Sequence, residues 1–340
     1  MKSLVALVLL AQLLSCKAGL VPDIPPEVLP HKHLACDDPE TEAAAAVAVN
    51  YINNRLKHGY KLVLNRIEKV VEHERRPHGK ILELELDLLE TVCHIVSPMP
   101  AENCTVRERT QHAVEADCDV KLLKDNGPYK VLLSKCHSSP DSHEDLVKFC
   151  PNCSPLSLLN DSNVVNTVNA ALAKYNAINT TQGHYELLEI ARGQHSHLAN
   201  SWYVEFAIIN TNCSAQHAKE HKEDCHVETG ENQHFGFCKA TFTKSLVEGT
   251  EDHQDVDCIV YDHQAGVAHV HLIEEHLKGN LGQAGRGYTF HNIIHSHNST
   301  SHSHSHSDEV VPVEKVSALV KRAVFVALPD CPGRYRHYDI

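Results

Sequence analysis

Three carboxylates occupy alternate positions in a segment whose pattern is typical of a β-strand. Residues 81–90 read Ile-Leu-Glu-Leu-Glu-Leu-Asp-Leu-Leu-Glu. Because successive side chains of a strand face opposite sides, we expect Glu83, Glu85 and Asp87 to face solvent in a row, spaced by about 6.8 Å. A single caged Ca²⁺ ion needs about six to eight converging oxygens. A regular row of carboxylates therefore favours a calcium-rich mineral surface, although an ordinary solvated strand has the same pattern.

Histidines form the second pattern that could do chemistry. The run His302-Ser-His304-Ser-His306 follows closely after His295 and His297. Neutral imidazoles bind Zn²⁺ or Cu²⁺, and their affinity rises as the pH rises through about 6.5. A solubilising polar tract has the same composition, and the pattern defines no fixed coordination geometry. We expect weak metal affinity here and no bound cofactor.

The cysteines show that the chain contains an internal duplication. Corresponding cysteines of two quartets lie 120, 121, 120 and 122 residues apart. The first quartet is Cys93, Cys104, Cys118 and Cys136, and the second is Cys213, Cys225, Cys238 and Cys258. We infer two copies of one disulfide-stapled domain.

The N-terminus and the composition indicate a secreted protein. Residues 1–18 have the charged start, short apolar run and small final residue of a signal peptide. Twelve cysteines remain after Cys16 is removed, an even number that favours disulfides, although spacing alone leaves their connectivity open. The net charge of −13 disfavours nucleic acid as a partner. No other segment is apolar enough to span a membrane, and we expect a monomer.

Each copy opens with a predicted helix and continues with alternating segments typical of strands. The first helix begins at Asp37-Asp38-Pro39 and ends near His58-Gly59, and the second covers 164–176 after Asn160-Asp161-Ser162. About four antiparallel strands follow each helix. The predicted class is α+β, with a helix wrapped by an antiparallel sheet in each copy.

The two copies differ on the outward face of the acidic strand. At an offset of 120 residues, the apolar row is retained, because Leu84, Leu86 and Leu88 match Val204, Phe206 and Ile208. The outward row changes to Tyr203, Glu205 and Ala207. Since a requirement of the fold should appear in both copies, we interpret the acidic row as functional.

Several motifs, taken together, resemble the fetuin family of the cystatin superfamily. The resemblance runs from end to end but is poor between about 259 and 330. It is carried by Cys36-Asp-Asp-Pro-Glu-Thr-Glu42, His58-Gly-Tyr-Lys61, Leu89-Glu-Thr-Val-Cys-His94, Gln111-His-Ala-Val-Glu115, Phe235-Gly-Phe-Cys-Lys-Ala240 and Cys331-Pro-Gly-Arg334.

The resemblance implies cystatin-like domains at 19–136 and 159–258, a linker at 137–158, and a His-rich, mostly irregular region at 259–340. It implies that neighbouring cysteines pair within each quartet, that Cys150 pairs with Cys153, and that Cys36 pairs with Cys331. It further implies a plasma glycoprotein that binds nascent calcium phosphate and inhibits its precipitation. The matching site residues are Glu83, Glu85 and Asp87, with Glu90 nearby.

Two inhibitory functions are alternatives. Cystatins that inhibit cysteine proteases resemble one another in a Gln-x-Val-x-Gly hairpin, and neither 75–79 nor 195–199 has that pattern. Some fetuins inhibit metalloproteinases by placing an acid from a Cys-Pro-Asp-Cys segment on the zinc. The matching segment here is Cys150-Pro-Asn152-Cys153, and an amide is a poor zinc ligand. Metalloproteinase inhibition through another surface is the main alternative.

Covalent modification is also predicted. The favoured N-glycosylation sequons are those of Asn103, Asn160, Asn179 and Asn298. The phosphorylation candidates are Ser138, Ser139 and Ser142, of which Ser142-His-Glu144 has the form that secretory kinases favour. Lys321-Arg322 is a candidate cleavage site. No catalytic motif is present, so we do not expect an enzyme.

Overall fold

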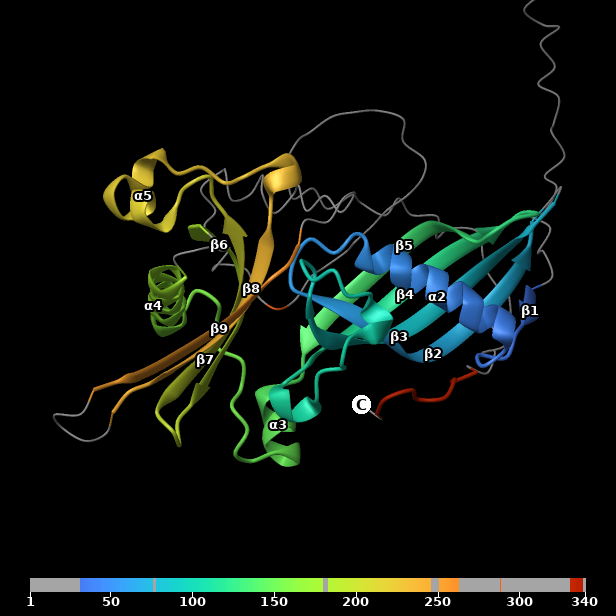
Figure 1. Ribbon diagram of the computed structural model, residues 1–340. Helices are drawn as coiled ribbons and strands as arrows, with labels where there is room; N and C mark the ends of the chain where they lie inside the picture. The colour runs from blue at the N-terminus through green and yellow to red at the C-terminus, as the bar shows by residue number, and fades with distance from the viewer. Residues whose placement is uncertain are drawn as a thin grey trace, which may run out of the picture.

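The computed structural model describes residues 31–75, 78–179, 183–245, 251–262, 288 and 331–338. The predicted signal peptide, the histidines between 295 and 306, Asn298 and Lys321-Arg322 lie outside these residues. The first domain is a five-stranded antiparallel sheet with one long helix across it (Figure 1). Its elements are β1 (His31–His33), α2 (Pro39–Asn53), β2 (Tyr60–Glu74), β3 (Lys80–His94), β4 (Val114–Lys124) and β5 (Lys130–Pro140).

The second domain repeats this plan with four antiparallel strands. Its elements are α4 (Ser162–Ile178), β6 (Tyr185–Ser196), β7 (Ser201–Asn210), α5 (Ala215–Glu220), β8 (Phe235–Thr243) and β9 (His253–Val260). The linker contains α3 (His143–Phe149). The predicted α+β class and the helix-wrapped sheets are confirmed. The predicted boundary at residue 136 falls inside β5, which continues to Pro140.

Local chemistry explains how each helix starts and how closely it packs. Asp38 caps α2 by accepting a hydrogen bond from the Glu40 amide, and Asp161 caps α4 in the same way. The buried face of α2 is rich in alanine, which lets the sheet approach closely. In the second domain the close approach is made by Gly193, where an added Cβ would lie 2.7 Å from Val164 Cγ2.

The register reproduces the predicted duplication. Leu86 pairs with Cys118 across β3 and β4, and Phe206 pairs with Cys238 across β7 and β8. The bridges Cys118–Cys136 and Cys238–Cys258 therefore staple equivalent strand pairs. The other bridges are Cys36–Cys331, Cys93–Cys104, Cys150–Cys153 and Cys213–Cys225, the pairing that the resemblance implies.

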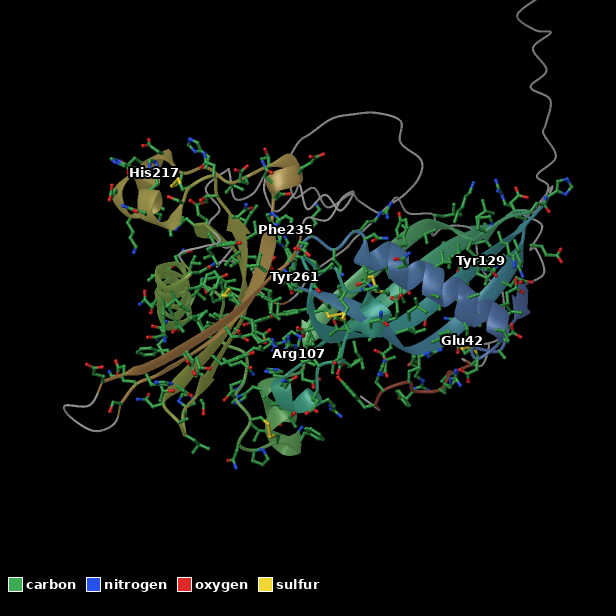
Figure 2. All side chains as sticks on the ribbon, in the orientation of Figure 1. Glu42, Arg107, Tyr129, His217, Phe235 and Tyr261 are labelled. Atoms are coloured by element: carbon green, nitrogen blue, oxygen red, sulfur yellow. A yellow bond between two sulfur atoms is a disulfide. The ribbon has the colours of Figure 1, made fainter. Side chains whose placement is uncertain are left out.

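The outward face of the second sheet is packed against the end of the first domain. Phe235, Phe237 and Ala207 belong to the same apolar cluster as Tyr60, and the His94 ring stacks on Phe237 at 5.2 Å between centroids. Figure 2 shows Phe235 in the region between the two sheets. Tyr203, Glu205 and Ala207 were expected to face solvent. That expectation is wrong for Glu205 and Ala207, which are both fully buried because the first domain covers them.

A chain of four buried charges, which we name the interdomain charge chain, completes this interface. Arg192 of the second domain donates from Nη2 to both oxygens of Glu90 of the first domain, at 2.8 and 2.9 Å. Arg107 donates to Glu90 at 3.2 Å and to Glu205 at 2.9 Å, so the chain crosses the interface a second time. Tyr60 also donates to Glu205. Burial raises the pKa of Glu205, but Arg107 and Arg192 outweigh it and hold this pKa at about 2.

The interdomain charge chain predicts different effects for two equivalent glutamates. Glu205→Gln leaves Arg107 without its full counter-charge in a buried site and should lower the free energy of unfolding by about 3 kcal/mol. Glu85→Gln, at the matching position of the first copy, removes one exposed ion pair and should cost at most about 0.5 kcal/mol. Urea unfolding with the disulfides intact measures both values. Equal losses of unfolding free energy would contradict the assignment of Glu205 to the interdomain charge chain.

Candidate functional site

Two of the predicted carboxylates lie on the exposed outer face of β3. The side chains of Glu83 and Glu85 are 41% and 48% exposed. Each has a basic neighbour, since Lys121 Nζ lies 2.7 Å from Glu83 and Lys69 Nζ lies 2.9 Å from Glu85. The sequence therefore places these two acids correctly, but their charge is partly compensated by adjacent strands.

Asp87 was expected to complete the exposed row, and that expectation is wrong. Its exposed fraction is 7%, and its Oδ2 accepts a hydrogen bond of 2.8 Å from Asn65 Nδ2. Asn65 in turn contacts the C-terminal segment 331–338, which lies over this end of the face. The alternation of β3 correctly predicts the side of the sheet, but not that a distant segment covers it.

Glu90, the fourth predicted residue, is also not available to a surface ligand. It is 3% exposed and belongs to the interdomain charge chain. Even-numbered positions of β3 such as Leu84, Leu86 and Leu88 face the core, and Glu90 shares their phase. Because Glu90 lies in the last third of β3, near the second domain, it forms an ion pair with Arg192 and does not pack against the helix.

Asp117 and Asp119 of β4 belong to the exposed acidic face and are absent from the sequence prediction. Asp119 lies directly opposite Glu85, and Asp117 directly opposite Asp87. Both aspartates are exposed, and neither forms an ion pair within the described part of the chain. The signal was present in Glu115-Ala-Asp117-Cys-Asp119-Val, which alternates in the same way as the acidic strand. We define Glu83, Glu85, Asp117 and Asp119 as the acidic face.

Electrostatic strain concentrates at the covered end of this face. Burial raises the pKa of Asp87 to about 6 against the opposing hydrogen bond from Asn65, and Asp117 adds to the rise. Burial likewise raises the pKa of Glu115 to about 7, and Asp141 and Asp87 raise it further. These carboxylates are held close together without enough positive charge to balance them.

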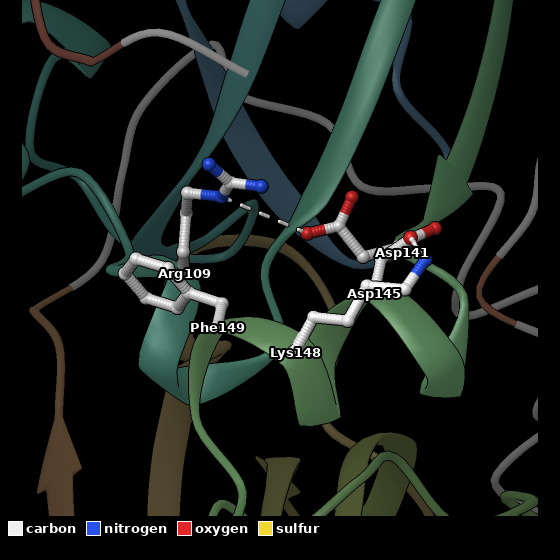
Figure 3. Close-up of a pocket in the computed structure, with 5 residues that line it drawn as sticks. All are labelled: Arg109, Asp141, Asp145, Lys148 and Phe149. Carbon is white, nitrogen blue, oxygen red and sulfur yellow. Dashed lines mark hydrogen bonds and ion pairs between the residues drawn. The ribbon is translucent and has the colours of Figure 1, made fainter.

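A shallow pocket of about 460 Å³ lies at α3 (Figure 3). It is lined by Arg109, Asp141, Asp145, Lys148 and Phe149. Arg109 lies over the Phe149 ring and 3.9 Å from Asp141. Because acids and bases alternate around the pocket, it does not extend the acidic face as a surface of one charge.

The modification candidates differ in their accessibility. Ser138 is fully buried, so the folded protein does not present it to a kinase, and the expectation for this residue is wrong. Ser139 is exposed, and exposed Ser142 caps α3 by accepting from the Asp145 amide. Asn103 and Asn160 are exposed, whereas Asn179 is half-buried and donates to the Tyr175 hydroxyl.

The linker forms a second exposed surface. Pro151 and Asn152 are exposed within the small loop closed by Cys150–Cys153. The linker then runs beside the end of β6, where Gln194 Nε2 donates to Ser154 O at 2.7 Å. Large apolar side chains are also exposed here, among them Leu158 after the linker loop and Leu198 at the β6–β7 turn.

The described residues contain no group of three or more His, Cys, Asp or Glu side chains arranged to hold one metal ion. The histidines predicted to bind Zn²⁺ or Cu²⁺ lie outside those residues, so their affinity stays a prediction. None of the helices in this part of the chain is long and apolar enough to cross a bilayer.

The raised pKa of Asp87 predicts a pH window for stability. The unfolded pKa is near 3.9 and the folded one is higher, so the folded state loses stability as the pH rises from about 4 to about 6. Asp87→Asn removes this titration. The variant should therefore gain about 1 kcal/mol relative to the wild type across that window and no more above it. Urea unfolding at several pH values tests this, and a difference independent of pH would contradict it.

Comparisons with known proteins place this geometry in context. The cystatin domain model matches residues 151–246. The antihemorrhagic factor cHLP-B of Gloydius brevicauda is 44% identical over the full length of both chains. Alpha-2-HS-glycoprotein of Mus musculus is 39% identical, also over both full lengths.

Two solved structures share the two-domain fold. Mouse fetuin-B in complex with crayfish astacin is 26% identical with a TM-score of 0.59, over 70% of this chain and 71% of that chain. The complex of human meprin beta with mouse fetuin-B gives 25% identity and a TM-score of 0.60, over 69% and 75%. With its duplicated helix-wrapped sheets, its six disulfides and relatives that match along its whole length, the chain belongs to the fetuin family of the cystatin superfamily.

Proposed function

We propose that this protein is a secreted binding protein that adsorbs to nascent calcium phosphate through the acidic face and limits its growth. The fetuin resemblance implies this function, and we assign it to the four carboxylates Glu83, Glu85, Asp117 and Asp119. The six disulfides fit an oxidising extracellular compartment. The acids stand on a rigid sheet and not on a loop, so they keep their spacing when they meet a solid surface.

One observation carries the proposal, namely the pairing of like charges across β3 and β4. Exposed Glu85 lies opposite exposed Asp119, and the covered Asp87 lies opposite exposed Asp117. Directly opposed side chains on antiparallel strands are separated by about 5 Å between Cβ atoms, and like charges at that distance are destabilising. A layer of Ca²⁺ relieves this repulsion with oxygen ligands that suit it. Several weak contacts on one rigid body then add up through effective concentration.

The acidic face can be tested by removing charge without changing shape. Glu83→Gln and Glu85→Gln combined with Asp117→Asn and Asp119→Asn should raise the protein concentration needed to block calcium phosphate precipitation by at least about tenfold. Each pair alone should have a smaller effect, because the other pair still binds. Turbidity of a supersaturated calcium phosphate solution measures the inhibition, and circular dichroism checks the fold.

Strand β9 offers a matched control. Asp255 and Asp257 are exposed, two residues apart on a strand, and belong to the second domain. Their replacement with asparagine removes charge with the same spacing and should leave inhibition unchanged. Full inhibition by the fourfold variant, or an equal loss in this control, would reject the acidic face as the binding surface.

Metalloproteinase inhibition is the second candidate function. It is supported by a relative named as an antihemorrhagic factor and by structural neighbours solved in complex with astacin and meprin beta. In this chain Asn152 takes the place of the acid expected at the zinc. We therefore assign any inhibition to apolar contacts from Leu158 after the linker loop and Leu198 at the β6–β7 turn, which are 72% and 78% exposed.

These two leucines can be changed without disturbing the core. Leu158→Ser with Leu198→Ser should raise the inhibition constant for an astacin-class proteinase by about 10-fold or more, since a few side chains that lose their water on binding carry most of the binding energy. Ile178→Ser, at the end of α4 and 68% exposed, is the control and should have no effect. Cleavage of a fluorogenic peptide gives the constants. Equal inhibition by the double variant and the wild type would remove the leucines from the interface.

A further inference from the structure

The segment Cys331–Tyr338, which we name the strap, lies against the free edge of β2. Strand β1 pairs only with residues 71–73 of β2, which leaves the edge near residues 65–67 uncovered by β1. The strap occupies it, because Gly333 N donates to Ile67 O at 2.8 Å and Arg336 N donates to Asn65 O at 3.0 Å. In Figure 1 this is the red segment that runs below β2.

The side chain of Asn65 joins the strap to a carboxylate of the sheet. Asn65 is fully buried, and its Nδ2 donates to Asp87 Oδ2 at 2.8 Å and to Tyr338 O at 2.9 Å. Its Oδ1 accepts from His337 N at 3.2 Å and from Tyr338 N at 3.4 Å. One amide group therefore binds both Asp87 and the strap backbone, so the strap and Asp87 are held in place together.

The last residue of the strap is bound to the segment before β4, since the Tyr338 hydroxyl donates to Arg107 O at 3.0 Å. Burial and, to a smaller extent, the carboxylate of Glu115 raise the pKa of the Tyr338 phenol. Through Asn65 the strap holds Asp87, whose own pKa burial raises to about 6.

The strap is held firmly at one end and by polar contacts elsewhere. Its covalent attachment is Cys36–Cys331, and Gly333 is so close to β2 that an added Cβ would lie 3.0 Å from Ile67 O. Further along, Arg336 pairs with Glu42 at 2.7 Å, and Arg66 lies over the Tyr335 ring at 4.3 Å. Polar contacts of this kind are weakened by competing ions, whereas the disulfide keeps a lifted strap attached.

We propose that the strap is an autoinhibitory cover of the calcium-binding surface. Docked, it hides Asp87, and the four carboxylates of the acidic face stay exposed. Lifted, it adds Asp87 to them, so that Asp87 joins Asp117 and Glu115 in one continuous patch on β3 and β4. This proposal rests on the proposed function, because calcium phosphate is the ligand that the enlarged patch receives. Ca²⁺ and the strap therefore compete for the same end of the sheet.

The test removes the strap but keeps its disulfide. A stop codon after Cys331 deletes residues 332–340 and leaves Cys36–Cys331 intact. Carbodiimide-promoted coupling of an amine to carboxylates, read by peptide mass spectrometry, should modify Asp87 in the truncated protein and not in the full chain. The truncated protein should also inhibit calcium phosphate precipitation at a concentration about threefold lower, since more contacts act together.

Full-length variants guard against a folding defect in the truncated chain. Tyr338→Ala and Arg336→Ala together remove the contacts with Arg107 and Glu42, and they should raise the coupling rate at Asp87 as the truncation does. Arg334→Ala is the control, because Arg334 is 70% exposed and lies 3.5 Å from Glu42. It should leave both readouts near the wild-type values.

Three results would decide the matter. Increased coupling at Asp87 together with stronger inhibition supports the strap as a cover. Unchanged coupling in the truncated chain overturns it, and so does increased coupling with unchanged inhibition. Failure of the proposed function has a different signature, since the variant that lacks all four acids of the acidic face would then inhibit precipitation as well as the wild type.

Discussion

Two glutamates and two arginines, buried between the domains, hold the molecule in one arrangement. Each domain contributes one residue of each charge, Glu90 and Arg107 from the first and Arg192 and Glu205 from the second. Buried charges are costly unless each one is paired and hydrogen-bonded. Since these four charges balance and pair only when both domains are present, they make the interface specific, and the apolar contacts of His94 and Phe237 add area to it.

This interface gives the two copies of the domain different surfaces. The outer face of the second sheet is buried against the first domain. Glu205 therefore becomes part of the interdomain charge chain, while the equivalent Glu85 remains in solvent. The loss of the acidic row in the second copy thus has a packing explanation. It is not by itself evidence of function. The opposed like charges of β3 and β4 carry that argument instead.

The two candidate functions use different parts of the chain. The acidic face lies on β3 and β4 of the first domain, and the exposed leucines lie beside the linker and at the β6–β7 turn. They share no residue, so one protein of this architecture can carry both surfaces. What distinguishes them physically is the kind of contact, charge spaced on a rigid sheet in one case and apolar side chains on turns in the other.

Sequence alone determined the features that depend on local spacing. The cysteine repeat predicted two copies, and the alternation of leucines predicted the core face of β3, because strand geometry relates neighbours directly. Only tertiary structure decided what covers the opposite face. Asn65 meets Tyr338, Arg107 meets Glu205, and Asp119 meets Glu85 across gaps that no period in the chain encodes. Alternation divides a strand into two faces, but strand pairing and domain packing determine which side chains on them remain in water.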